Sequence, residues 1–216
     1  MIRPFLLPLF VALAMAQPAL ASERTVMAPA AVRAANEAPG LKNAVFAGGC
    51  FWGVEGVFSH INGVTSAVRG YHGGTRGKAN YDQVSAGVTG HAESVRVTYD
   101  PARVRYDQLL RIFFSVITDP TQLNRQGPDT GLHYRSALVP MSEEQRLTAA
   151  AYLAQLSAAR IWRAPIVTRI ERHLRQRHDA ALFWAEARRA DDARLGEAGL
   201  VELFAQQPDR GRRNAG

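Results

Sequence analysis

The chain has 216 residues, of which 47% are hydrophobic and 21% are charged, a composition typical of a globular protein with one core. Its formal net charge is +7, but it has no run of five or more like charges, and its basic residues do not interleave with aromatic ones. We therefore interpret the charge as a solvated basic surface and expect no nucleic-acid partner.

The first 21 residues have the pattern of a secretory signal peptide. Arg3 precedes an apolar run over 5–16, and Ala19-Leu20-Ala21 is a small-x-small cleavage motif. The alternative is an uncleaved membrane anchor, but a spanning helix needs about 20 apolar residues, and Gln17-Pro18 ends the run earlier. We expect removal of residues 1–21, a periplasmic mature protein and no stable membrane insertion.

The segments on either side of the expected domain lack apolar periodicity. Residues 22–40 are rich in alanine and contain Pro29 and Pro39, which predicts a flexible linker with nothing to bury. Residues 204–216 are predicted to form a disordered tail. The folded domain is therefore expected over residues 41–203.

Strands and helices follow one another without strict alternation in this domain. Ser142 and Gln145 have the spacing of a capping box at the start of one helix. The order favours an α+β fold, a two-layer sandwich with a mixed central sheet and a ferredoxin-like core, over a doubly wound sheet. Strands are expected over 42–47, 64–71, 91–99, 134–139 and 165–170, helices over 54–61, 109–117, 142–156 and 183–195, and long loops over 72–90 and 118–133.

Cys50 is the single cysteine of the chain. An exported protein with one cysteine cannot form an internal disulfide, so this thiol is either buried and inert or used chemically. Cys50 follows Gly48-Gly49 where a strand meets a helix, and the free N–H groups of a helix start favour a thiolate and lower its pKa. Phe51 and Trp52, beside the thiol, are either core residues or the walls of an apolar slot.

Two carboxyl groups and two phenols are further candidates. On the alternating strand 91–99, Glu93 shares a face with the apolar residues, and a buried carboxyl tends to stay protonated and can donate a proton. The alternative is that Glu93 points into solvent at the strand start. Tyr81, Tyr134 and Asp129 lie in or beside polar loops, which often carry function, although each taken alone is more often structural.

Four motifs in matching order and spacing resemble the methionine sulfoxide reductase A family, over about residues 41–170. They are Gly48-Gly49-Cys50-Phe51-Trp52-Gly53, which resembles the active-site motif of the family; residues 71–84, which resemble the segment of its first tyrosine; Gly90-His91-Ala92-Glu93, which resembles its acid-bearing strand; and residues 126–136, which resemble its second substrate loop.

The resemblance implies an enzyme that reduces free or peptide-bound methionine S-sulfoxide and repairs oxidised exported proteins. Phe51 and Trp52 would hold the S-methyl group of the substrate, and oxygen transfer would leave methionine and a sulfenic acid on the cysteine. The implied catalytic set consists of a nucleophile, a proton donor, two hydroxyl donors to the sulfoxide oxygen and a carboxylate that orders the pocket: Cys50, Glu93, Tyr81, Tyr134 and Asp129.

The chain departs from the family in its C-terminal region. Many members carry further cysteines there that resolve the sulfenic acid, whereas this chain has none. An external thiol must therefore reset Cys50, and a thioredoxin-like protein or a small thiol is the expected reductant. Residues 183–186 resemble the family, but the His-Gln pair expected soon after is replaced by residues 187–190.

Two other classes of protein stay open at this point. One is a cysteine hydrolase built on Cys50, His91 and Asp129, since an imidazole can activate a thiol. The other is a non-catalytic protein that binds sulfoxides. No metal is expected, because the chain has no His-Glu-x-x-His or Cys-x-x-Cys pattern and a single cysteine offers little for zinc. No bound cofactor is expected either. We expect a monomer.

Overall fold

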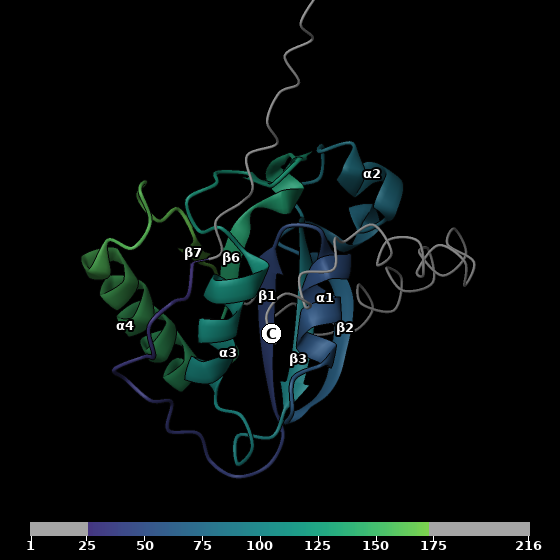
Figure 1. Ribbon diagram of the computed structural model, residues 1–216. Coiled ribbons are helices and arrows are strands. Elements are labelled where there is room, and N and C mark those ends of the chain that lie inside the picture. Colours follow the sequence, from purple (N-terminus) through teal and green to yellow (C-terminus); the bar gives the residue numbers. More distant parts are fainter. Residues whose placement is uncertain (1–25, 173–216) are drawn as a thin grey trace, which may run out of the picture.

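The computed structural model describes residues 26–172, and a mixed five-stranded sheet lies at their centre (Figure 1). The strand order is β2-β3-β1-β6-β7. Neighbouring strands pair antiparallel except for β6 and β7, which are parallel. The strands are β1 (Lys42–Gly48), β2 (Val64–His72), β3 (Ala92–Tyr99), β6 (Ser136–Val139) and β7 (Arg169–Ile170).

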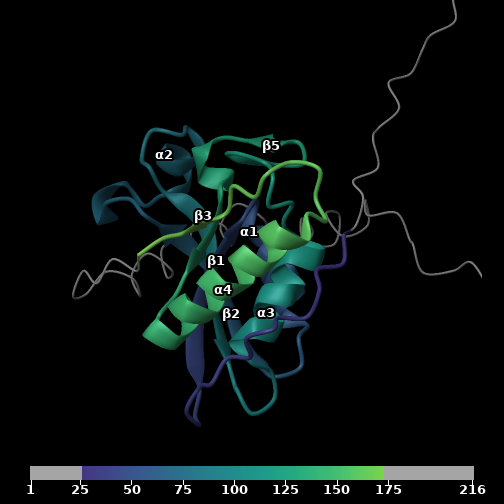
Figure 2. The same cartoon turned by 90° about the vertical axis from the view of Figure 1, so that its left-hand side faces the viewer.

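Three helices lie on one face of this sheet (Figures 1 and 2). They are α1 (Phe51–Ser59), α3 (Tyr106–Ile112) and α4 (Glu143–Ala159), and α3 continues into a π-helical turn, η2 (Phe113–Ile117). The α+β fold with a mixed central sheet is confirmed. The ferredoxin-like core stays a prediction.

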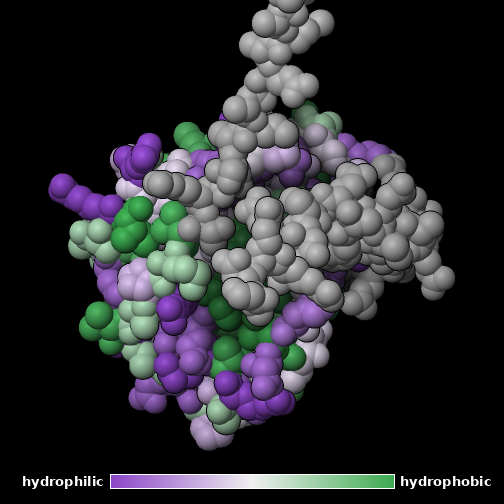
Figure 3. All heavy atoms as spheres, in the orientation of Figure 1, coloured by the Kyte–Doolittle hydropathy of each residue, from purple (hydrophilic) through white to green (hydrophobic). Residues whose placement is uncertain are grey.

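The main core lies between the sheet and these helices because alternate residues of the strands point to the helical face. Phe46 of β1 contacts one ring from each of two helical segments, with ring centroids 4.7 Å from Phe58 and 5.4 Å from Phe113. Val45 and Val139 form a smaller buried cluster on the other face. On the face drawn in Figure 3, hydrophilic and hydrophobic residues are interspersed wherever the surface is coloured.

Short elements occupy the predicted loops. The loop 72–90 contains the single turn η1 (Arg76–Lys78) and α2 (Tyr81–Ser85), which begins where the Asn80 side chain accepts a hydrogen bond from the Gln83 N–H. The loop 118–133 contains a hairpin of β4 (Arg125–Gln126) and β5 (Asp129–Thr130), followed by the turn η3 (Leu132–Tyr134). Elements of two to five residues are too short to show periodicity, so the sequence predicts them poorly.

The last strand and the predicted capping box both differ from the expectation. The last strand was predicted over 165–170, but only Arg169–Ile170 pair with β6. The capping box is half correct: the Ser142 hydroxyl accepts from the Gln145 N–H, whereas the Gln145 side chain accepts from the N–H of Met141.

The flexible linker predicted over 22–40 is wrong for its described part, which packs along α3, η2 and α4. Ala28 is 1% exposed, and its N–H donates to the Ser115 hydroxyl at 3.0 Å. The Tyr152 hydroxyl donates to the carbonyl oxygen of Pro29 at 2.6 Å. Small alanine side chains fit closely against the helices, and side chains of the helices bond to the backbone of the segment, so it is ordered without apolar periodicity.

Several predictions fall outside the described residues. They concern the signal peptide over 1–21, the helix over 183–195 and the tail over 204–216. Within residues 26–172, no helix is long and apolar enough to cross a membrane.

Candidate active site

Two glycines place Cys50 where β1 ends and α1 begins. Gly49 has a φ of +100°, which favours glycine, and a Cβ there would lie 2.7 Å from the Cβ of Gln126. A Cβ on Gly48 would lie 2.7 Å from a ring carbon of Phe113. The chain therefore turns sharply and leaves a partly exposed Cys50 at the N-cap of α1, one position before the predicted first turn.

The predicted lowering of the Cys50 pKa is wrong. Burial is the main cause of a rise in its pKa from 9.0 to about 11, and the nearby Glu93 adds to that rise. The N–H groups of Trp52 and Gly53, at the helix start, lower the pKa by less, and Asp129 raises it further. The thiol is therefore protonated at neutral pH.

Glu93 lies on the buried face of β3, as predicted, with 2% of its surface exposed. Its Oε2 accepts a hydrogen bond of 2.9 Å from the N–H of Phe51, the first residue of α1. It stands opposite Tyr71 of β2 in the sheet register. The carboxyl group is thus held one residue from Cys50, and its protonation state stays a prediction.

Tyr134, in η3, shows that the predicted catalytic groups come together. Burial raises the pKa of its phenol, and Glu93, Asp129, Cys50 and Tyr81 raise it further. Each of these four groups is therefore close enough to Tyr134 to shift the pKa of its phenol, although they come from four separate segments of the chain. The structure brings together all five predicted members of the catalytic set.

The two aromatic residues after Cys50 have different environments. Phe51 is fully buried, and its ring centroid lies 5.7 Å from that of Tyr71. Trp52 is partly exposed, and its ring meets that of Phe51 edge-on, with centroids 6.2 Å apart. Trp52 is therefore the ring of the pair that a ligand can reach, and Phe51 packs behind it.

His91 does not have the environment of a base that activates Cys50. It is 1% exposed, and its pKa is lowered to about 4 by burial first and then by the electrostatic effects of Arg135 and His72. The charges that shift the pKa of Cys50 are those of carboxylates. A thiol–imidazole pair would instead lower the pKa of the thiol, so the geometry disfavours the hydrolase.

The family model described as "Peptide methionine sulfoxide reductase" matches residues 42–181. The chain belongs to this family. Members of the peptide methionine sulfoxide reductase family are oxidoreductases that reduce methionine sulfoxide and use no prosthetic group, and the predicted membership is confirmed.

This reductase is similar in sequence to other members of the family over 130 residues or more. The chain is 55% identical to "Peptide methionine sulfoxide reductase MsrA 2" of Mesorhizobium japonicum over 134 residues, which cover 62% of this chain and 69% of the relative. It is 49% identical to the MsrA of Deinococcus radiodurans over 130 residues, 60% of this chain and 63% of the relative. The match thus spans slightly less than two thirds of the second relative.

Two solved structures have a similar fold. The methionine sulfoxide reductase A of Corynebacterium diphtheriae has a TM-score of 0.50 and 31% identity, over 70% of this chain and 79% of that one. The reduced form of Mxr1 from Saccharomyces cerevisiae has a TM-score of 0.53 and 30% identity, over 62% of this chain and 81% of that one.

The sequence did not predict a partly buried network of ion pairs that lies beside the segment of Tyr134. The Arg135 guanidinium donates two hydrogen bonds to the Glu171 carboxylate, at 2.9 and 3.1 Å, and others to the carbonyl oxygens of Gly90 and Leu132. His72 Nε2 lies 3.1 Å from the same carboxylate. The network joins the residue after β7, the loop before β3 and the turn that carries the phenol of the site.

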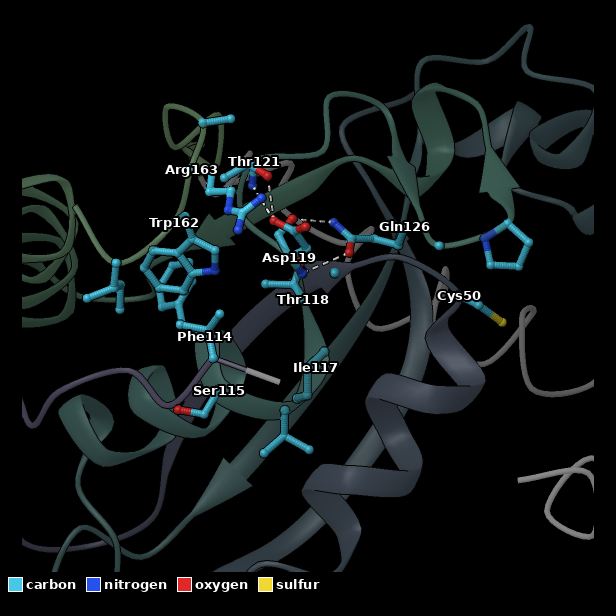
Figure 4. Close-up of a pocket in the computed structure, with 17 residues that line it drawn as sticks. Cys50, Phe114, Ser115, Ile117, Thr118, Asp119, Thr121, Gln126, Trp162 and Arg163 are labelled. Atoms are coloured by element: carbon cyan, nitrogen blue, oxygen red, sulfur yellow. Dashed lines mark hydrogen bonds between the residues drawn. The ribbon is translucent and has the colours of Figure 1, made fainter. Parts of the chain in front are cut away.

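A cavity of about 650 Å³ lies beside Cys50 and was also not predicted. It runs from Cys50 to Trp162 and Arg163, and in Figure 4 the Cys50 sulfur points away from the other lining residues. Two hydrogen bonds of 2.9 Å join the Gln126 side chain to the backbone of Asp119 in its wall. Among residues 26–172, no cluster of His, Cys, Asp or Glu side chains could hold a metal ion.

Proposed function

We propose that this protein reduces the S epimer of methionine sulfoxide, free or within a peptide, with Cys50 as the nucleophile. The observation that carries the proposal is the arrangement around the thiol. The carboxyl of Glu93 is fixed on the first N–H of α1, and Tyr134 lies within electrostatic reach of Cys50, Glu93, Tyr81 and Asp129.

The raised pKa of Cys50 indicates how its proton would be used. Moving the thiol proton to the Glu93 carboxylate would remove the charge that opposes the thiolate, and it would leave a neutral carboxyl group that can donate a proton. Glu93 then passes that proton to the sulfoxide oxygen, which the hydroxyls of Tyr81 and Tyr134 also hydrogen-bond. The protonated sulfoxide sulfur becomes electrophilic and is attacked by Cys50.

The atoms of this step balance without another reactant. The sulfoxide loses its oxygen to Cys50, so that Cys50 becomes a sulfenic acid and the substrate becomes methionine. Trp52 and Phe51 would hold the S-methyl group, and Asp129 would help to order the pocket. These roles are those that the resemblance to the family implies.

Resetting the enzyme requires a thiol from outside, because Cys50 is the one cysteine in the sequence. A first thiol condenses with the sulfenic acid to a mixed disulfide and water, and a second thiol releases Cys50. A thioredoxin-like protein or a small thiol fits this role. No bound cofactor takes part.

We also propose that residues 1–21 direct export, so that the enzyme repairs oxidised proteins in the periplasm. The support is the sequence pattern alone. Cell fractionation and N-terminal sequencing test this point: a periplasmic protein that begins at Ser22 is expected, and an unprocessed protein in the cytoplasm would overturn it.

A single-turnover assay without added thiol tests the chemistry. Mature protein is mixed with peptide-bound methionine S-sulfoxide, and methionine and trapped sulfenic acid are counted. About one equivalent of each per Cys50 is expected, and the R epimer should give neither. Folded protein that binds the sulfoxide but forms no methionine would instead be the non-catalytic binding protein.

A further inference from the structure

A buried arginine stacks on the accessible aromatic ring of the site. Arg69 of β2 is 7% exposed, and its guanidinium carbon lies 3.6 Å from the ring centroid of Trp52. Its Nε also forms an ion pair of 2.7 Å with the Glu55 carboxylate. Phe51 lies farther away, 5.9 Å from the same guanidinium.

The positions of these residues in the fold explain the stack. Arg69 and Tyr71 are two residues apart on β2, so they lie on the same face of the strand. That face is covered by α1, which packs on β2. Trp52 and Glu55 are three residues apart on α1 and therefore lie on the same side of the helix. Glu55 consequently draws the guanidinium over the indole.

A buried charge of this kind is costly unless it is paired, so the arrangement needs an explanation. Arg69 has its partner in Glu55, and its planar group covers one face of an indole, as guanidinium groups do where they recognise aromatic rings. Phe51 meets the same indole edge-on. Two contacts thus restrict the Trp52 side chain, although its surface stays partly exposed.

We propose that Arg69 and Glu55 are positioning residues that hold the Trp52 indole in the orientation that accepts an S-methyl group. The inference rests on the proposed function and deepens it, because it assigns the choice between methyl and larger S-alkyl groups to this pair. The clamped indole cannot turn aside to enlarge the site for an ethyl group. Neither residue takes part in the chemical step at Cys50.

The test measures binding apart from chemistry. Single-turnover rates are recorded against concentration for the S epimers of methionine sulfoxide and ethionine sulfoxide. In Arg69→Met the half-saturating concentration for the methyl substrate should rise on the order of tenfold, as for loss of one desolvated cation–π contact. The saturating rate should change by less than about threefold, and the preference for methyl over ethyl should fall.

Two further variants separate positioning from bulk and charge. Arg69→Lys keeps the cation but not the planar stack, so its half-saturating concentration should lie between those of the wild type and Arg69→Met. Glu55→Gln should shift both the concentration and the methyl preference in the same direction as Arg69→Met. This variant also carries the test if Arg69→Met does not fold.

Arg96→Met is the matched control, because Arg96 is a half-buried arginine of the same sheet that points to the opposite face. Its stability, measured as Tm, is expected to fall, whereas its substrate preference should be that of the wild type. If Arg69→Met and Glu55→Gln lower Tm and leave both the half-saturating concentration and the methyl preference unchanged, the ion pair is only structural and the proposal is overturned.

A readout without substrate keeps this inference separate from the proposed function. With Trp162→Phe and Trp184→Phe, Trp52 is the one remaining tryptophan. Its fluorescence anisotropy should fall, and its quenching by acrylamide should rise, when Arg69→Met is added. Unchanged values would overturn the clamp, whereas a wild-type protein that forms no methionine would overturn the proposed function alone.

Discussion

Replacing Glu93 by Gln should make Cys50 a better acid and the protein a worse catalyst. The glutamine amide oxygen can still accept from the Phe51 N–H, which Glu93 Oε2 accepts at 2.9 Å, so the local fold should persist. What is lost is the charge that raises the pKa of the thiol and the proton that the mechanism passes to the sulfoxide oxygen.

The structure bounds the size of the first effect. The pKa of Cys50 is raised from 9.0 to about 11, with burial as the largest cause and Glu93 as the second. The rise in the Cys50 pKa that burial causes is larger than the lowering by the N–H of Trp52. The rise that Asp129 causes is likewise larger than the lowering by the N–H of Gly53, so without Glu93 the pKa stays at or above 9.0. At neutral pH the thiolate fraction therefore rises by at most about 100-fold.

The second effect acts in the opposite direction. Loss of a general acid lowers the rate of the chemical step by about 10²- to 10⁴-fold. The thiol pKa is measured from the pH dependence of iodoacetamide alkylation, and the oxygen transfer from single-turnover formation of methionine. A Glu93→Gln protein with a wild-type transfer rate would remove Glu93 from the chemistry, and an unchanged thiol pKa would contradict the electrostatic argument.

Further predictions concern the nucleophile, the ion network and the N-terminal segment. Cys50→Ser should abolish methionine formation with little change in Tm, and retained turnover would refute the mechanism. Burial raises the pKa of Glu171, but the hydrogen bonds and charges of its partners His72 and Arg135 together outweigh it and lower the pKa from 4.5 to about 2. Its stabilising contribution is therefore present above pH 4.5 and is lost as the pH falls towards 2. Glu171→Gln should flatten the dependence of Tm on pH in that window, and an equal slope in both proteins would argue against the ion pair. Ala28→Leu should lower the free energy of unfolding in urea by about 1–3 kcal/mol through overpacking, whereas Val32→Ala, at an 89% exposed site, should change it little. Equal stability of the two variants would mean that the segment does not pack in solution.

The parts of the site that depend on neighbours in the sequence were predictable. A strand that ends in two glycines placed Cys50 at the start of a helix, and the alternation of β3 placed Glu93 on the buried face. Both inferences need only the local periods of strand and helix. The family resemblance then named the partners, and the structure brings Tyr81, Tyr134 and Asp129 to the same place.

Contacts between distant segments were not predictable in the same way. Nothing in the run of alanines around Ala28 reveals that a helical turn more than 80 residues away supplies a hydroxyl that accepts from its N–H. The network of Arg135 and Glu171 joins residues 36 apart in the sequence, and no periodic pattern marks either residue. Arg69, on β2, gives no sign in sequence that it stacks on Trp52.

The sequence by itself determined the chemistry available to this protein: one thiol at a helix start, one carboxyl on a buried strand face and the motifs of its family. Only the tertiary structure decided the resting charge of that thiol. The helix start lowers the pKa of Cys50 through bonds within four residues, whereas burial and Glu93 raise it through space. Desolvation and through-space charge depend on which segments pack together, so the local pattern alone predicted the wrong sign.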